Sequence, residues 1–166
     1  LSKKIFKREE MKAEETGMLK NILSFLETHE RKIIIVLIIF LLSKMTGLLI
    51  NQSESLEGKV FLLLKSWPYK TGHIVGLEPN LLKKVGGREG DKIHIHENEI
   101  FVGDLKIGPL FDKTSLGKPL HPLQTREIPK GKLFVFGTHP RSFDSRYLEF
   151  GLVDERRILG KAIRVL

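Results

Sequence analysis

The sequence of 166 residues contains no cysteine. Disulfide bonds and thiolate metal sites are therefore excluded, although a chain without cysteine can belong to the periplasm as well as to the cytosol. Long blocks of lysine or arginine are also missing, because the net charge of +8 is scattered along the chain. We therefore expect no nucleic-acid partner. Internal repeats and low-complexity tracts are absent, and the length suits one domain with an additional anchor or tail.

The N-terminal segment, residues 1–32, is rich in charges of both signs. Apolar residues between Met18 and Leu26 recur at helical spacing. We interpret residues 1–32 as a charged, partly helical cytoplasmic arm.

Residues 33–50 are the most apolar stretch of the chain, and Lys44 is their only charged residue. Eighteen residues of helix measure about 27 Å, close to the roughly 30 Å of a bilayer core. The stretch therefore predicts a single transmembrane helix, with a buried helix of a soluble domain as the alternative. No small-residue cleavage site follows, which favours a retained anchor over a removed signal peptide.

The charges that flank residues 33–50 predict an orientation. Arg31 and Lys32 precede this stretch, whereas Glu54 and Glu57 follow it. The positive-inside tendency places the N-terminus in the cytoplasm and residues 51–166 on the other side of the membrane.

The pattern after residue 50 is typical of β structure. Strands are expected at 59–66, 92–97, 132–137 and 157–166. A Gly-Asp turn between two apolar pieces of residues 99–108 indicates a hairpin. We therefore predict a mainly β domain over residues 51–166, folded as a coiled sheet or partly closed barrel.

Three short polar stretches lie within this β domain. They are NQSESLEGKVF (51–61), LLKKVGGREGDKI (81–93) and GTHPRSFDSRY (137–147). Taken singly, they suit a linker, a solvated strand face and a turn pinned by Asp and Arg. In this order they resemble the signal peptidase I family of Ser/Lys-dyad serine peptidases, and within it the conjugative-transfer (TraF-type) branch. The resemblance covers about residues 33–166 and includes the closing Gly160 to Ala162.

The resemblance implies a role for each of several residues. Ser55 would be the nucleophile and Lys83 its general base, chosen over Lys84 because a basic residue follows the catalytic lysine in the family. Ser53 would offer its hydroxyl to the oxyanion, and Ser142 would orient the lysine amine. A lysine is a base only when neutral, so this mechanism requires burial to lower its pKa from about 10.4.

Asp144 and Arg146 would support the site by holding their segment in place. Because they are two residues apart, they would lie on one side of an extended segment. They could then clamp a neighbouring turn rather than each other. The first stretch departs from the family pattern at Glu57, where proline is usual, so Ser53 stays a second candidate for the nucleophile.

The remaining polar residues have weaker interpretations. We expect no cofactor and no metal, although His94 and His96 share one strand face and could begin a metal site. His139 has no assigned role, and Arg141 is expected to be solvated.

The function implied by the resemblance is that of a serine endopeptidase anchored in the bacterial inner membrane, with its catalytic domain in the periplasm. Its partners would be the bilayer, an exported precursor such as a conjugative propilin, and a type IV secretion or conjugation machinery. An acyl-enzyme also permits cyclising transpeptidation. Two alternatives stay open: a general signal peptidase I, and a catalytically silent, membrane-tethered β scaffold of a secretion apparatus.

Overall fold

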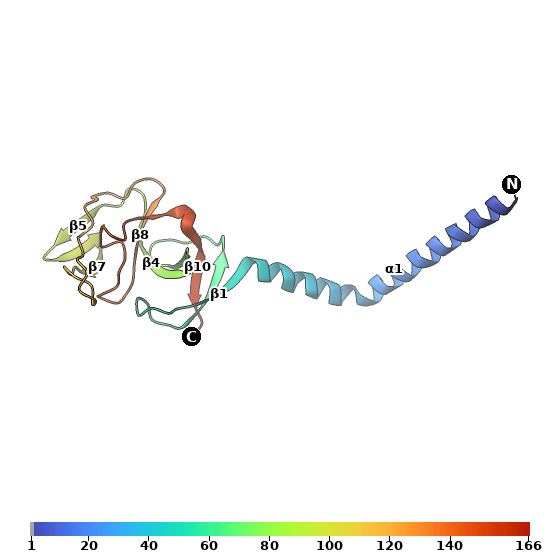
Figure 1. The fold of residues 1–166 in the computed structure, drawn as a ribbon, viewed down its shortest axis with the longest axis horizontal. Coiled ribbons are helices and arrows are strands. Elements are labelled where there is room, and N and C mark those ends of the chain that lie inside the picture. Colours follow the sequence, from blue (N-terminus) through green and yellow to red (C-terminus); the bar gives the residue numbers. More distant parts are fainter. Residues whose placement is uncertain (1) are drawn as a thin grey trace. The chain divides into compact units, whose positions relative to one another are not determined.

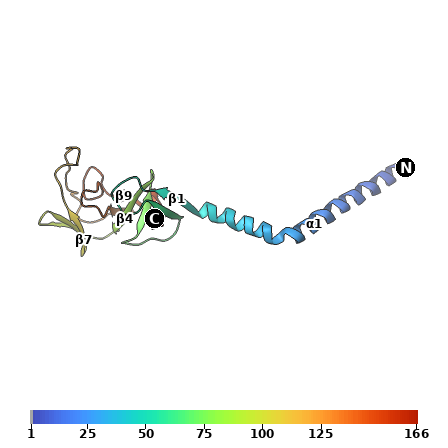
Figure 2. The same cartoon turned by 90° about the horizontal axis from the view of Figure 1, so that it is seen from below.

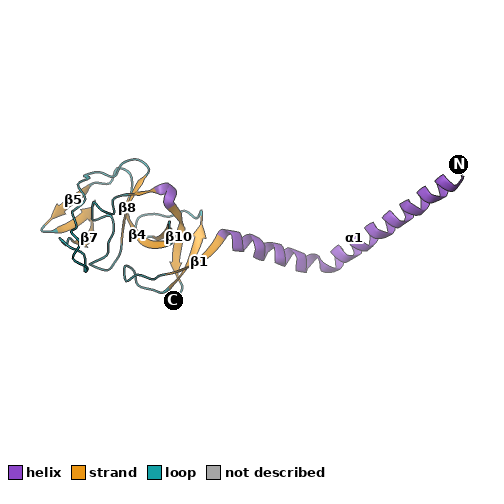
Figure 3. Ribbon diagram, in the orientation of Figure 1, coloured by secondary structure: helices purple, strands orange, loops and turns teal. Residues whose placement is uncertain are grey.

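The computed structural model describes residues 2–166, with side chains from residue 16 onward except at 23, 26 and 28. The chain divides into two compact units, residues 1–44 and 45–166. Helix α1, Ser2–Met45, makes up the first unit (Figure 1). Apart from α1, the described residues contain one helical element, the short 3₁₀ helix η1, Glu155–Arg157 (Figure 3).

Helix α1 is continuous where we predicted a partly helical arm followed by a separate span. Lysine, glutamate, methionine and leucine recur along it, and all of them favour helix. The predicted helical stretch 33–50 is wrong at its end, because α1 stops at Met45 and strand β1, Thr46–Ile50, follows. Threonine and glycine are weak helix formers, and the backbone of Thr46–Ile50 pairs with strand β2 instead.

The apolar part of α1 is exposed on every side. Each of residues 34–42 is between 50% and 64% exposed. Among the described residues, no helix combines the length and the sustained apolar character needed to span a bilayer. The transmembrane helix therefore stays a prediction.

A seven-stranded antiparallel sheet forms most of the second unit, in the order β1-β2-β10-β3-β4-β8-β9. Besides β1, its strands are β2 Val60–Lys65, β3 Ile74–Leu77, β4 Leu81–Gly87, β8 Lys132–Phe136, β9 Val153–Asp154 and β10 Ile158–Arg164. The C-terminal strand β10 therefore lies inside the sheet, between β2 and β3.

A smaller sheet contains β5 Ile93–His96, β6 Glu99–Val102 and β7 Leu105–Pro109. Strands β6 and β7 confirm the predicted hairpin, with Gly103 and Asp104 in its turn. In both ribbon views β7 lies at the end of the β unit away from β1 (Figures 1 and 2). The mainly β fold is confirmed, but the partly closed barrel is wrong, because both described sheets are open.

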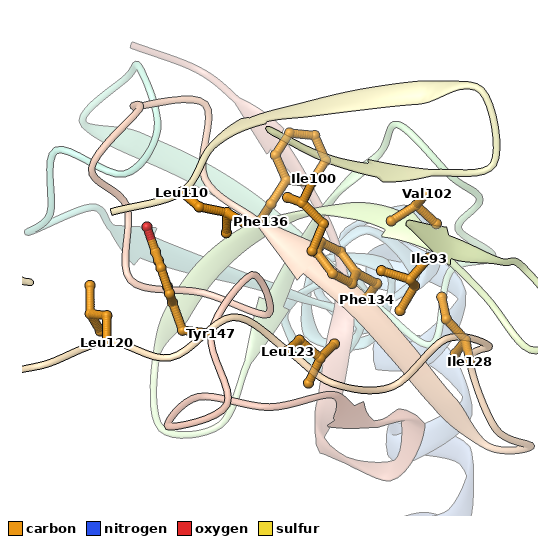
Figure 4. Close-up of a cluster of buried hydrophobic side chains, with 10 residues drawn as sticks. All are labelled: Ile93, Ile100, Val102, Leu110, Leu120, Leu123, Ile128, Phe134, Phe136 and Tyr147. Atoms are coloured by element: carbon orange, nitrogen blue, oxygen red, sulfur yellow. The ribbon is translucent and has the colours of Figure 1, made fainter. Parts of the chain in front are cut away.

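Two apolar clusters fix the strands that matter for the site. The larger one packs the three-stranded sheet against β8, and Phe134, Phe136 and Tyr147 contribute its aromatic rings (Figure 4). A second cluster lies on β3, β4 and β8 and is centred on Val75, Val85 and Val135. Strand β4 is therefore held by buried contacts along its length, which makes it a rigid support for the polar residues it carries.

Candidate active site

Lys83 lies on strand β4, an interior strand of the seven-stranded sheet, opposite Val75 of β3. Leu81 and Val85 are two residues away on the same face, and both belong to the apolar cluster of β3, β4 and β8. Packing against these apolar residues leaves Lys83 only 1% exposed. The adjacent Lys84 faces the other side of the sheet, with its amine 6.0 Å from the centre of the Phe136 ring.

The amine of Lys83 reaches three oxygen atoms, none of which belongs to a carboxylate. The distances from Nζ are 3.1 Å to Ser55 Oγ, 2.8 Å to Ser142 Oγ and 2.9 Å to the Phe143 carbonyl oxygen. The structure thus brings together Ser55, Lys83 and Ser142. In sequence, Ser55 is 28 residues and Ser142 is 59 residues from Lys83. The Phe143 carbonyl is a third partner that the sequence did not indicate.

Burial lowers the pKa of Lys83 from 10.5 to about 8. The nearby Asp144 carboxylate raises this pKa and the Arg146 guanidinium lowers it, both less than burial does. With a pKa near 8, about one molecule in ten carries a neutral amine at pH 7. An ordinary surface lysine would be neutral in fewer than about one in a thousand.

Ser55 is half-buried in the loop between β1 and β2. The Asn51 side chain holds this loop, because its Nδ2 donates to the carbonyl oxygens of Leu56 at 2.8 Å and Gly58 at 3.0 Å. Leu56 is 5% exposed and packs into an apolar cluster. The His139 backbone N–H donates to the Ser55 carbonyl at 3.3 Å, which joins the loop to the third polar stretch.

Ser53 lies in the same loop but is exposed. Its hydroxyl donates to Asn51 Oδ1 at 3.1 Å, and its backbone N–H donates to the same oxygen at 3.2 Å. Of the two serines in this loop, Ser55 and not Ser53 has its hydroxyl within hydrogen-bonding distance of the Lys83 amine. The predicted oxyanion role of Ser53 stays a prediction.

Asp144 and Arg146 pair with each other and also clamp the turn, so the expectation that they clamp a turn rather than each other is wrong on the second point only. Arg146 Nε and Nη2 each donate to an Asp144 carboxylate oxygen at 2.9 Å, and both side chains are at most 1% exposed. Asp144 also accepts the Gly137 N–H at 2.9 Å. Arg146 donates to the carbonyls of Pro140 at 2.8 Å and Ser142 at 3.0 Å. The pair therefore closes the turn that carries Ser142.

Comparison with known proteins supplies the family. The sequence matches the family described as signal peptidase, peptidase S26, over residues 30–166. The chain belongs to the signal peptidase S26 family. Among solved structures, a signal peptidase I from Enterococcus faecalis V583 is similar at 19% identity and a TM-score of 0.42, over 57% of this chain and 97% of that chain. No curated protein matches the sequence.

Membership of the signal peptidase S26 family implies a serine peptidase that processes exported proteins. Beside the cluster of Ser55, Lys83 and Ser142, this signal peptidase has a cavity of about 300 Å³ that Ser55 and Ser142 help to line. Glu54, His139 and Arg141 line the same cavity. A polypeptide can therefore approach Ser55 through a space with charged walls.

Gly137 is a further residue that sequence reasoning missed. A Cβ atom there would overlap Ser142 Oγ and would lie 2.6 Å from the Ser55 carbonyl oxygen. Only glycine lets the end of β8 approach both serine segments so closely. Its place at the start of the third polar stretch was the one available signal, but sequence alone does not tell a packing glycine from a turn glycine.

The other polar residues singled out in the sequence lie outside the cluster of Ser55, Lys83 and Ser142. Within the part of the chain that the structure describes, no three His, Asp or Glu side chains gather as a metal-binding group. His94 stacks on Phe101 with ring centres 5.1 Å apart. Arg141 is exposed, and its guanidinium lies 4.3 Å from the centre of the Phe111 ring.

Proposed function

We propose that this signal peptidase is a serine endopeptidase in which Ser55 is the nucleophile and Lys83 is its general base. The observation that carries the proposal is the 3.1 Å distance between a fully buried Lys83 amine and the Ser55 hydroxyl. Serine needs a base to remove its proton, and lysine becomes one when burial lowers its pKa.

The three contacts of Lys83 suit both protonation states of its amine. A charged amine has three N–H donors for three oxygen acceptors. A neutral amine has two N–H donors, which suit the Phe143 carbonyl and Ser142 Oγ, and one lone pair, which then faces Ser55 Oγ. Only the hydrogen bond to Ser55 has to reverse its direction, so the proton moves without rearrangement of side chains.

The reaction follows from this arrangement. Ser55 Oγ attacks the scissile carbonyl while its proton passes to Lys83 Nζ, and the carbonyl oxygen becomes an oxyanion. The Ser55 N–H and the Ser53 hydroxyl would stabilise the oxyanion, at roughly 3–4 kcal/mol for one such donor. Lys83 then returns the proton to the leaving amine as the C–N bond breaks. Water, or an amine in a transpeptidation, releases the acyl group from Ser55.

The precursor in this proposal is a conjugative propilin, with a general secretory precursor as the second candidate. The stretch from Gly137 to Tyr147 supports the conjugative branch, because it begins Gly-Thr-His-Pro.

The exposed apolar run of residues 34–42 supports attachment to the inner membrane with the N-terminus in the cytoplasm. Protease treatment of spheroplasts is expected to degrade residues 51–166 and to spare residues 1–32.

The direct test uses the full chain in lipid with a propilin and with a secretory precursor. We expect Ser55→Ala and Lys83→Ala each to lower precursor cleavage by more than about a thousandfold. Lys84→Ala is the matched control, since Lys84 faces the other side of the sheet. If both dyad variants still process the precursors, the proposed mechanism is wrong. A serine-directed lactam should modify Ser55, whereas a silent scaffold would not react.

The pH dependence gives an independent test of Lys83 as the base. Because the neutral amine is the active form, kcat/KM should rise about tenfold per pH unit below the pKa of the base. The rise should end near pH 8, where the pKa of Lys83 lies. A profile that is flat between pH 6 and about 8 would contradict this role.

A further inference from the structure

A second cavity of about 110 Å³ adjoins the one at Ser55. The two cavities share Ser115, Arg141 and Phe143 as lining residues. The second cavity is otherwise lined by Phe111, Lys113, Thr114, Leu120 and Tyr147, so no acidic residue lines it. Its size suits one short side chain rather than a length of peptide.

Arg141 has the properties of an unused carboxylate-binding group. Its guanidinium lies over the Phe111 ring, with Cζ 4.3 Å from the ring centre, and this cation–π contact holds it at the cavity wall. It takes part in none of the ion pairs found among the described residues. A planar guanidinium that forms no ion pair within the described residues is suited to bidentate binding of a carboxylate.

The walls of the second cavity are held together before any ligand arrives. Arg146 donates to the carbonyls of both Pro109, at 3.2 Å, and Pro140, at 2.8 Å. The Tyr147 hydroxyl accepts the Phe111 N–H at 3.2 Å. The segment that follows β7 and the turn that carries Arg141 are thus tied through neighbouring buried residues, and such preorganisation lowers the cost of binding.

We propose that the second cavity binds an aspartate or glutamate side chain of the substrate, with Arg141 as its main partner and Lys113 as a second positive charge. This inference rests on the proposed function, because the ligand is the polypeptide that is cut at Ser55. The first cavity does not offer the same environment, since Glu54 lines it and repels a carboxylate. The enzyme would therefore select substrates with an acidic residue a short distance from the scissile bond.

The test compares short alanine-based peptides that carry one glutamate at each position in turn with their glutamine counterparts. Binding is measured by fluorescence anisotropy to full-length Ser55→Ala in detergent, and cleavage is measured with the active enzyme. At one position, glutamate should improve binding and kcat/KM about tenfold over glutamine, as a charge-assisted hydrogen bond allows. Arg141→Gln should abolish the preference, and Arg141→Glu should reverse it in favour of lysine at the same position.

Arg126→Gln is the matched control, because it removes one positive charge beside a different cavity and should keep the preference for glutamate. An equal affinity of Ser55→Ala for glutamate and glutamine peptides at every position would overturn the inference. So would a glutamate preference that survives Arg141→Gln. Because binding is measured without cleavage, these outcomes are distinct from a failure of Ser55 or Lys83 as catalytic residues.

Discussion

Two ion pairs in this signal peptidase have the same local geometry in different surroundings. In Asp144–Arg146 and in Asp154–Arg156, the arginine follows the aspartate by two residues. In both, the arginine backbone N–H and Nε donate to Oδ1, and Nη2 donates to Oδ2. The arginine side chain is 1% exposed in the first pair and 90% exposed in the second.

The difference between the pairs lies in what else they hold. Asp144 accepts the Gly137 N–H, and Arg146 donates to several carbonyls of the surrounding segments. Asp154 caps the short helix η1, and within the described part of the chain the guanidinium of Arg156 donates hydrogen bonds to Asp154 alone. The buried pair Asp144–Arg146 therefore holds several segments together, whereas the exposed pair Asp154–Arg156 is a surface contact. The reason is that water does not compete for the hydrogen bonds of the buried pair.

The largest expected effect comes from breaking the two pairs in parallel. Arg146→Met leaves Asp144 charged and unpaired in the interior, and should lower the free energy of unfolding by about 3–5 kcal/mol. Arg156→Met should lower it far less, because water solvates the freed Asp154. Urea denaturation measures both values. Equal losses for the two variants would mean that burial is not what separates the pairs.

Gly137→Ala tests the close packing around Gly137, whose backbone N–H donates to the buried Asp144. The added methyl group would press on Ser142 Oγ and the Ser55 carbonyl, so we expect a loss of about 1–3 kcal/mol in unfolding free energy. Cleavage of the precursor should fall as well, because both serines contact Lys83. Gly17→Ala is the control, since nothing lies within 4 Å of a Cβ at Gly17. A harmless Gly137→Ala would show that the segments of Ser55 and Ser142 can separate without cost.

Lys83→Met extends the comparison to a buried cation that forms no ion pair with any described residue. Unlike Arg146→Met and Gly137→Ala, this substitution should raise the free energy of unfolding. Folding lowers the pKa of Lys83 from 10.5 to about 8, so burial of the charged amine costs roughly 3 kcal/mol at neutral pH. The loss of donors to Ser142 and Phe143 offsets part of this gain. We expect Lys83→Met to stabilise the inactive protein by about 1–2 kcal/mol.

The stabilisation by Lys83→Met should depend on pH. Between pH 8 and 10.5 the unfolded chain binds more protons at Lys83 than the folded one. The free energy of unfolding of the wild type therefore rises with pH in this window, and the advantage of Lys83→Met should shrink there. Denaturation curves at neutral and alkaline pH measure this trend, and a constant advantage would contradict the lowered pKa.

The smallest expected effect concerns the exposed pair. Hydrogen bonds from Arg156 hold the pKa of the Asp154 carboxyl below its ordinary value of 3.8. The stabilisation from this group is present above the ordinary value and is lost as the pH falls through the lowered pKa. An NMR titration of Asp154 should show the low pKa, and Arg156→Met or added salt should move it back up. An unchanged titration in Arg156→Met would exclude the arginine as its cause.

Much of the β architecture could be predicted from local sequence. The hairpin over residues 99–108 follows from a Gly-Asp turn between apolar pieces, and strand β8 follows from a run of apolar residues. Strand β3 was missed because it has only four residues, IVGL. Strand β1 was assigned to a helix because its leucines and isoleucine suit either structure, and only its pairing with β2 distinguishes them.

The chemistry of the site divides in the same way. The resemblance of the three polar stretches to the signal peptidase I family nominated Ser55, Lys83, Ser142, Asp144 and Arg146, because a short motif can be matched from local sequence. Which neighbouring lysine is buried, which serine hydroxyl meets it and which oxygens complete its contacts depended on the packing of β4 against distant loops. A lysine acquires a pKa near 8 only where other parts of the fold exclude water from it, and no short stretch of sequence contains that environment.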